Sequence, residues 1–281
     1  MYSSIQDLGR FGYQEFGVPY SGGMDTYATK MVNLFLGNEE NAAVMEITML
    51  GPSLEFECET LICVSGAEMS PKLNQSDIPN NKVIPVKKGD VLSFGKLKLG
   101  FRCYLGVLGG FNTETVMQSR SMYEGITSTL RIQKGDILPV EIRTLNNLRK
   151  HAHIKERKDY LRTETIEVFE GPEFDLLSKS QQKELLTSKF SISKDNNRMA
   201  YQLAESFEND LEPIITSAVM PGTVQLTPSG KLIILMRDCQ TTGGYPRVLQ
   251  LMEIAINVLA QKFTGQTIQF KCLNSKQVLI R

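Results

Sequence analysis

Histidine is nearly absent from this sequence of 281 residues, and its scarcity argues against the common hydrolase mechanisms. The two histidines, His151 and His153, lie in a polar, basic stretch at residues 149–158. A Ser-His-Asp or Cys-His hydrolase needs a base within hydrogen-bond reach of its nucleophile, and a solvated basic tract is a poor place for one. The His-x-His spacing also suits a metal pair, but no further ligand stands nearby, so no metal site is predicted.

The cysteines and the charges exclude further classes of protein. The five cysteines are an odd number and contain no Cys-x-x-Cys pair, which argues against a disulfide framework and against a zinc finger. Lysine plus arginine and aspartate plus glutamate both total 31. No excess positive charge therefore exists to hold a nucleic acid or an anionic membrane surface.

Long hydrophobic segments are also missing. The longest apolar runs, such as residues 232–236, fall far short of the roughly 20 residues that cross a bilayer. The first seven residues lack the basic and apolar regions of a secretory signal. We therefore expect a cytoplasmic protein that binds neither nucleic acid nor membrane.

Short strands separated by turns dominate what the sequence does contain. Hydrophobic residues make up 41% of the chain, enough for the core of two domains or of one large β-rich domain. One helix is predicted at residues 25–37, because Asp25 can cap its start and Gly37 can end it. The apolar pattern then predicts strands at residues 44–50, 53–57, 60–65, 82–86, 90–94, 100–108 and 136–140. The predicted fold is mainly β with a few helices (α+β).

A polar, basic segment divides the chain into two parts. Residues 146–162 form the predicted connector between an N-terminal β-rich module, residues 1–145, and a C-terminal β module, residues 163–281. The turn sequence Lys-Gly-Asp at residues 88–90 recurs at 134–136, with a looser Thr-Gly-Gln version at 264–266, so we expect similar β modules in both parts. In the second part we predict strands at 165–169, 223–227 and 232–236 and helices at 174–186 and 248–262.

Glycine and polar residues gather in residues 6–25. There Ser21, Gly22 and Gly23 lead directly into the helix that Asp25 caps. A glycine-rich approach to a helix start exposes backbone N–H groups and the positive end of the helix dipole, which suits a carboxylate or a phosphate. The alternative is that Asp25 only caps its helix while the glycines turn the chain.

A second such segment covers residues 237–247. It follows the predicted strand at 232–236 and precedes the predicted helix at 248–262, and ligands often bind at the carboxyl end of a strand. Asp238 is a candidate general base or acceptor for an amide N–H, and the Gly243 and Gly244 amides are candidates to stabilise an oxyanion. Cys239 has no histidine to accompany it, so we do not expect it to be a nucleophile.

The two segments resemble a known family. The matching motifs are Gln6-Asp7-Leu8-Gly9-Arg10, Gly17-Val18-Pro19, Ser21-Gly22, Met24-Asp25 and Gln240-Thr241-Thr242-Gly243-Gly244-Tyr245-Pro246, with further matches at Ser119-Arg120-Ser121 and Pro221-Gly222-Thr223-Val224-Gln225. They look like the biotin-dependent carboxyltransferase family, also called allophanate hydrolase subunit 2. This family includes the C subunit of 5-oxoprolinase and the carboxyltransferase part of urea carboxylase.

The resemblance implies a fold, an activity and partners. The implied fold is two cyclophilin-like β-barrel modules, and the implied companions are the B subunit of the enzyme, of related fold, and its A subunit. The implied activity is that of an ATP-dependent 5-oxoprolinase, which opens 5-oxoproline to L-glutamate only as a complex that uses ATP. One alternative is a carboxyltransferase subunit that moves CO2 from carboxybiotin, borne on a biotin carrier protein, to urea or a related amide. Another alternative is a regulatory binding module that antagonises an inhibitor of a histidine kinase.

The resemblance also implies the site residues. The implied catalytic residues are Asp238, Gln240, Thr241, Gly243, Gly244 and Tyr245. The implied substrate-binding residues are Asp7, Arg10, Ser21, Gly22, Met24, Asp25, Arg198 and Thr242. In this interpretation the lactam contacts are Asp238, Gln240 and Thr241. Gly243 and Gly244 hold the oxyanion, and Arg198 meets phosphate. Asp7 and Arg10 are expected to shape the opposite wall of a single cleft.

Overall fold

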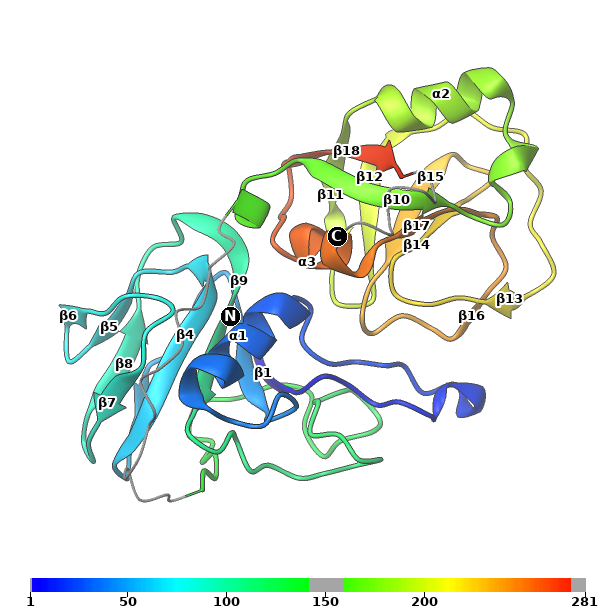
Figure 1. The fold of residues 1–281 in the computed structure, drawn as a ribbon. Helices are drawn as coiled ribbons and strands as arrows, with labels where there is room; N and C mark the ends of the chain where they lie inside the picture. The colour runs from blue at the N-terminus through cyan, green and yellow to red at the C-terminus, as the bar shows by residue number, and fades with distance from the viewer. Residues whose placement is uncertain (1, 142–158, 274–281) are drawn as a thin grey trace. The chain divides into compact units, whose positions relative to one another are not determined.

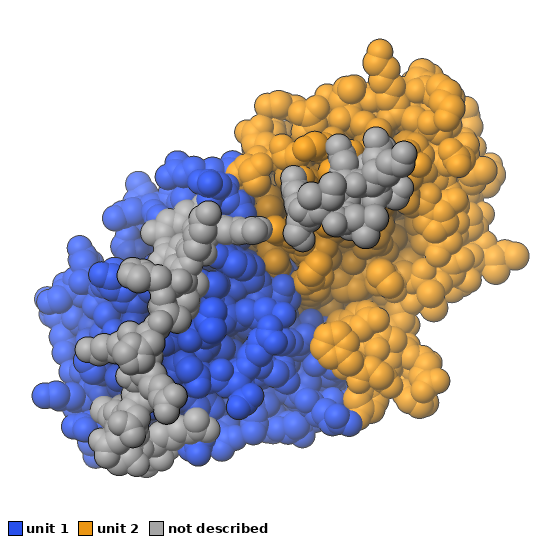
Figure 2. All heavy atoms as spheres, in the orientation of Figure 1, with its two compact units in different colours: residues 1–10, 21–162 blue, residues 11–20, 163–281 orange. Residues whose placement is uncertain are grey.

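The chain forms two compact units. The computed structural model describes residues 2–141 and 159–273. Unit 1 comprises residues 1–10 and 21–162, and unit 2 comprises residues 11–20 and 163–281 (Figure 2). The short segment 11–20 thus belongs with the second half of the chain. Most of the predicted connector at 146–162, including His151 and His153, lies outside the described residues, and the predicted module boundaries stay a prediction.

Unit 1 is built from two antiparallel sheets. The first has the order β1-β2-β9-β4-β7. Its strands are β1 (Tyr2–Gln6), β2 (Val44–Thr48), β9 (Leu99–Val107), β4 (Thr60–Glu68) and β7 (Ile84–Val86). The second sheet has the order β3-β8-β5-β6, with β3 (Leu54–Glu55), β8 (Val91–Phe94), β5 (Pro71–Leu73) and β6 (Ser76–Asp77).

Helix α1 (Thr26–Leu36) packs on β4 and β9 of the first sheet (Figure 1). Its buried face, Ala28, Val32 and Leu36, joins Cys63 and Tyr104 in one apolar cluster. The close approach requires a glycine, because a Cβ at Gly106 would lie 2.1 Å from Val32 Cγ1. The alternate residues of β4, Ile62 and Val64, belong to a second core cluster among the described residues of unit 1, as the two-residue period of a strand requires.

Local capping fixes the ends of α1 as the sequence predicts. The Asp25 carboxylate accepts a hydrogen bond from the backbone N–H of Ala28 at 3.0 Å. Gly37 ends the helix in the left-handed conformation, with a φ of 67°.

Unit 2 contains a closed seven-stranded barrel. Its order is β10-β17-β14-β15-β12-β11-β18, in which only the closing β10–β18 pair is parallel. The strands are β10 (Thr165–Glu170), β17 (Arg247–Leu251), β14 (Thr223–Leu226), β15 (Lys231–Leu235), β12 (Ala200–Ser206), β11 (Phe190–Asn196) and β18 (Thr267–Cys272). Helices α2 (Lys179–Thr187) and α3 (Glu253–Ala260) accompany the barrel, and β13 (Ser217–Ala218) pairs separately with β16 (Thr242–Gly243). The mainly β fold class with few helices is confirmed, and so is the barrel in this unit.

Three of the predicted elements differ from the structure. Residues 136–140 form no strand, and only an isolated bridge joins Val140 to Phe111. The helix predicted at 174–186 is a 3-10 turn at Phe174–Leu176 followed by α2, because a capping box at Ser178 starts a new helix. The helix predicted at 248–262 is strand β17 followed by α3.

The prediction for the β17 segment is wrong because its apolar residues also fit a helical period. Val248, Leu249 and Leu251 are buried between β10 and β14, and only Glu253 begins the helix. The loop 237–247 therefore connects two barrel strands rather than a strand and a helix. Across the described residues no helix is long and apolar enough to cross a membrane.

Candidate functional site

Asp7 is the centre of a closed hydrogen-bond network in unit 1. It directly follows β1 and is only 2% exposed. Its Oδ1 accepts hydrogen bonds from Gly9 N at 2.8 Å and from the Ser119 and Ser121 hydroxyls at 2.7 Å each. Its Oδ2 accepts one from Arg120 N at 2.7 Å. Four donors of the protein thus hold this carboxylate and join residues 7–9 to residues 119–121.

Arg10 holds the turn that precedes those serines. Its Nε donates to the Val116 carbonyl oxygen at 3.3 Å, and its Nη2 donates to the Ser121 carbonyl oxygen. Between these two carbonyls the chain makes a tight turn in which Met117 and Gln118 have φ values of 52° and 61°. Non-glycine residues adopt this left-handed conformation at an energetic cost, so the Arg10 and Asp7 contacts keep a strained turn in place.

The amides at the start of α1 already have protein partners. Met24 N donates to Glu46 Oε2 at 2.7 Å, and Asp25 N donates to the Tyr104 hydroxyl at 2.8 Å. That hydroxyl in turn donates to Glu46 Oε2 at 2.8 Å. Burial is the main cause that raises the pKa of Tyr104 above its usual range, so the phenol stays a donor. The cap by Asp25 thus accounts for the Ala28 amide, whereas Glu46 and Tyr104 accept from the Met24 and Asp25 amides.

The residues before this helix fold back over Asp7 and its neighbours. Gly23 N donates to the Asp7 carbonyl oxygen at 2.9 Å. Gly22 has a φ of 87°, and a Cβ there would lie 2.9 Å from Gly9 N. Ser21 is buried and also left-handed, with a φ of 55°. The predicted site residues of unit 1 therefore lie close together, and they largely contact one another.

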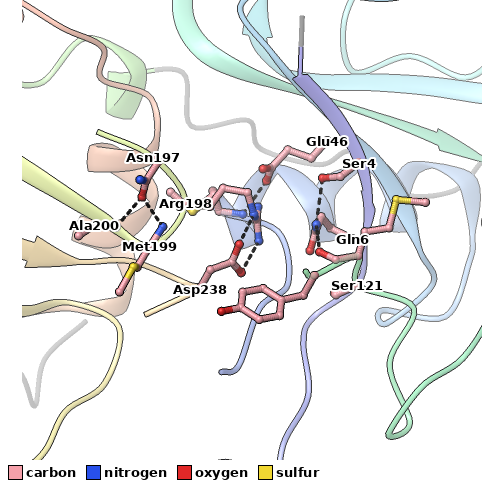
Figure 3. Close-up of polar contacts among 12 residues, drawn as sticks. Ser4, Gln6, Glu46, Ser121, Asn197, Arg198, Met199, Ala200 and Asp238 are labelled. Carbon is pink, nitrogen blue, oxygen red and sulfur yellow. Dashed lines mark hydrogen bonds and ion pairs between the residues drawn. The ribbon is translucent and has the colours of Figure 1, made fainter. Parts of the chain in front are cut away.

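In unit 2, Asp238 forms a fork with Arg198. Arg198 Nε lies 2.7 Å from Asp238 Oδ2, and Arg198 Nη2 lies 3.0 Å from Asp238 Oδ1 (Figure 3). Both side chains are buried, and Asp238 N also donates to the Arg198 carbonyl oxygen at 2.9 Å. A two-point contact between charged groups is strong and directional. Because both carboxylate oxygens face the guanidinium, the geometry favours a fixed ion pair over a general base.

Backbone hydrogen bonds hold the rest of the loop against residues 214–219. The Thr241 carbonyl oxygen accepts from Val219 N at 3.0 Å, and the Gly244 carbonyl oxygen accepts from Ile214 N at 3.0 Å. Between them, Thr242 and Gly243 form strand β16, opposite Ala218 and Ser217 of β13. The loop is thus a short, paired ribbon with a defined backbone.

Two polar groups of this loop have no protein partner within residues 2–141 and 159–273. The Gly244 N–H makes no hydrogen bond there. The Gln240 Oε1 atom is buried and likewise lacks a donor. Tyr245 is 40% exposed. One donor and one acceptor on nearby residues are therefore left for a ligand, in contrast to the saturated carboxylate of Asp7.

Cys239 is an inert thiol, as its lack of a histidine partner suggests. It is 2% exposed. Burial first, and then the charge of Asp238, raise the pKa of this thiol to about 12. The reactive thiolate is therefore scarce at neutral pH.

Sequence reasoning missed two sets of residues that support the loop. Gln225 lies beneath it and donates from Nε2 to the Tyr245 carbonyl oxygen at 3.3 Å. Arg247 pairs with Glu173 through two contacts of 2.8 and 2.9 Å and also donates to the Ala218 carbonyl oxygen at 3.1 Å. The Arg247 guanidinium lowers the pKa of the Glu173 carboxyl. Gln225 stands inside a motif used for the resemblance, but no sequence signal marks Glu173.

The predicted site residues divide between the two units. Asp7, Arg10, Ser21, Gly22, Met24 and Asp25 belong to unit 1, whereas Arg198 and residues 238–245 belong to unit 2. Each set is brought together within its own unit. The single cleft expected from the sequence stays a prediction.

These features define a class of protein: a mainly β chain whose closed barrel carries a polar, glycine-bearing ribbon at an ion pair. The sequence model of the family described as "Carboxyltransferase domain, subdomain A and B" matches residues 16–272. The chain belongs to this family.

Three relatives illustrate the match. The chain is 32% identical over 278 residues to the C subunit of 5-oxoprolinase from Escherichia coli (strain K12), a match that covers 96% of this chain and 88% of that relative. It is 28% identical to the Saccharomyces cerevisiae urea amidolyase, over 96% of this chain but 16% of the relative. The solved structure of the Kluyveromyces lactis urea amidolyase superposes with a TM-score of 0.84 at 29% identity, over 97% of this chain and 18% of that one.

The relatives named here are therefore enzymes or parts of enzymes. A solved structure of the protein TTHA0988 also superposes, with a TM-score of 0.85 at 23% identity, over 96% of this chain and 54% of that one. At that identity the likeness concerns the fold alone.

Proposed function

We propose that this chain is the C subunit of an ATP-dependent 5-oxoprolinase, which opens 5-oxoproline to L-glutamate together with its A and B subunits. The E. coli relative with that name matches nearly the whole chain. The observation that carries the proposal is a pair of groups without a hydrogen-bond partner among the described residues, the Gly244 N–H and the buried Gln240 Oε1, on a backbone otherwise held by hydrogen bonds. A lactam presents the complementary groups, a carbonyl oxygen and a ring N–H.

The chemistry of ring opening explains why such groups are useful. The oxygen of water forms a bond to the lactam carbonyl carbon, the bond from that carbon to nitrogen breaks, and the nitrogen takes up a proton. The carbonyl oxygen gains negative charge before the bond breaks. A fixed backbone N–H directed at that oxygen lowers the barrier, because it needs no reorganisation when the charge develops. In this proposal Gly244 supplies the N–H, while Gln240 accepts from the lactam nitrogen.

The Arg198–Asp238 pair has a different role in this proposal. Asp238 fixes the Arg198 guanidinium through both of its oxygens, so the cation keeps one orientation. A fixed guanidinium suits the phosphate groups of the ATP that the complex consumes. Asp238 thus acts as a positioning residue for Arg198, rather than as the base considered from the sequence.

The proposal is tested with the chain and both partner subunits. The chain alone should release no glutamate, whereas the complete complex should release it from 5-oxoproline and ATP. Gln240→Ala should lower kcat/KM by roughly tenfold to a hundredfold, since it removes one oriented substrate contact. Asp238→Asn should lower it similarly, while Asp210→Asn, an exposed position of the same unit, should not. If Gln240→Ala kept full activity, the loop would not be part of the active site. If the complete wild-type complex showed no activity, the proposed function would be wrong.

A related function is favoured by the match of the urea amidolyase to 96% of the chain. In that case the chain transfers CO2 from carboxybiotin to urea or a similar amide, and the same open groups bind a ureido group. A carrier protein that co-purifies with the chain and reacts with avidin, together with biotin-dependent carboxylation of urea, would support this function over ring opening.

A further inference from the structure

Two adjacent glycines of the loop differ in what surrounds them. Neither Gly243 nor Gly244 has a positive φ, so alanine is compatible with the backbone at both positions. A Cβ on Gly243 would lie 2.5 Å from Gln225 Nε2, far inside van der Waals contact. Among the described residues, a Cβ on Gly244 would meet only the Ile214 carbonyl oxygen, at an ordinary 3.5 Å. A methyl at Gly243 therefore requires the Gln225 amide to shift, whereas one at Gly244 fits among the described residues without such a shift.

Gln225 is a buried side chain that contacts the loop on both sides of the Gly243–Gly244 peptide. It projects from β14 and is 2% exposed. Its amide lies directly beneath Gly243 and donates to the Tyr245 carbonyl oxygen at 3.3 Å. The N–H of Gly244 belongs to that peptide, so Gln225 contacts the backbone on both sides of this donor.

We propose that Gln225 is a positioning residue for the Gly244 N–H, and that the two glycines are needed for different reasons. Gly243 makes room for the Gln225 amide inside the barrel unit. Gly244 leaves a bare backbone against which a planar amide of the lactam or ureido class can lie closely. A glycine that no neighbour requires, beside an open N–H, is typical of a backbone that a ligand approaches. The ligand half of this inference rests on the proposed function, whereas the Gln225–Gly243 contact does not.

The steric half is tested by a double-mutant cycle read from the thermal midpoint of the purified chain. Gly243→Ala should lower the Tm in the otherwise unchanged chain. In the Gln225→Ala background the same substitution should lower it much less, because the clashing amide is gone. Equal losses in both backgrounds would show that Gln225 is not the reason for the glycine.

The positioning half is tested with Gln225→Met, which keeps the volume but removes the donor. Hydrogen–deuterium exchange of residues 241–246 should become faster in the purified chain. In the complete complex kcat should fall severalfold with little change in KM, because the N–H is misdirected rather than lost. The matched control is Gln202→Met on β12 of the same barrel, where the side chain makes no hydrogen bond among the described residues. Unchanged exchange in Gln225→Met would overturn the positioning role.

The ligand half is tested with Gly244→Ala. This variant should keep the wild-type Tm, because space for the methyl exists, yet lose roughly tenfold or more in kcat/KM. Retention of full kcat/KM would overturn the close approach of a ligand at Gly244. If the wild-type complex opens no lactam, the proposed function fails, but the Tm cycle and the exchange rates still decide the role of Gln225.

Discussion

The saturated carboxylate of Asp7 leads to a stability prediction that separates a structural from a substrate-binding role. Asp7→Asn keeps the size of the side chain but replaces one oxygen by an NH2 group. If the nitrogen takes the place of Oδ2, it faces the N–H of Arg120, which then loses its acceptor. If it takes the place of Oδ1, it faces the N–H of Gly9. In either orientation at least one backbone donor, part-buried at Arg120 or buried at Gly9, is left without a partner.

The size of the effect follows from these contacts. An unpaired buried N–H costs about 1–3 kcal/mol, and loss of the charge weakens the remaining hydrogen bonds. We expect a total loss of about 3 kcal/mol in the free energy of unfolding. For a chain of this size that corresponds to a fall of roughly 6–12 °C in Tm.

Urea and thermal unfolding followed by circular dichroism measure this effect. The control is Asp77→Asn in the same unit, where the carboxylate is 82% exposed and pairs with Lys72 only at the surface. A surface pair of this kind contributes about 0–1 kcal/mol, so the control should unfold close to the wild type. If Asp7→Asn also unfolds like the wild type but raises KM, the carboxylate contacts substrate and the structural interpretation is refuted.

Three further predictions concern single side chains. Cys239 should resist labelling by a disulfide reagent in the native protein at pH 8, because burial raises the pKa of its thiol to about 12; rapid labelling would contradict its burial. Arg247 lowers the pKa of Glu173 in the folded chain. The ion pair therefore contributes its full stability at a pH above the pKa that Glu173 has in the unfolded chain, and this contribution is lost as the pH falls through the lower pKa of the folded chain. From about pH 5 to 3, the free energy of unfolding measured in urea should therefore fall less for Glu173→Gln than for the wild type. Equal falls in both proteins would refute this. Tyr160→Phe removes a hydrogen bond of 2.8 Å to Asp25 and should cost about 1 kcal/mol in unfolding experiments, whereas no loss would show that this bond contributes nothing.

Local signals explain which parts of the fold the sequence predicts. The ends of α1 depend on Asp25 and Gly37, whose caps act within a few residues, and both appear as expected. Strand β17 is mistaken for a helix because Val248, Leu249 and Leu251 fit a helical as well as a strand period over so short a segment. Only pairing with β10 and β14, far away in sequence, decides between them.

The roles of the site residues depend on partners that are distant in the sequence. The sequence shows that Asp7 and Asp238 each lie in a polar, glycine-bearing segment. It does not show that the Asp7 carboxylate meets serines 112 and 114 residues away, or that Asp238 meets an arginine 40 residues away. A carboxylate in a polar loop is equally compatible with a base, a ligand contact or an ion pair until its neighbours are known.

Two ion pairs of unit 2 lie at the two ends of the loop 237–247. Asp238 pairs with Arg198 where the loop begins, and Arg247 pairs with Glu173 where it ends. Each pair uses two contacts, so the ends of the loop are fixed while the ribbon between them keeps its polar groups for other partners. Stabilisation of a developing charge requires donors that are already in place, and anchored ends provide this without filling the site. The same residue types in the Asp7 network serve to close a strained turn, which is why the chemistry is expected at residues 240–245.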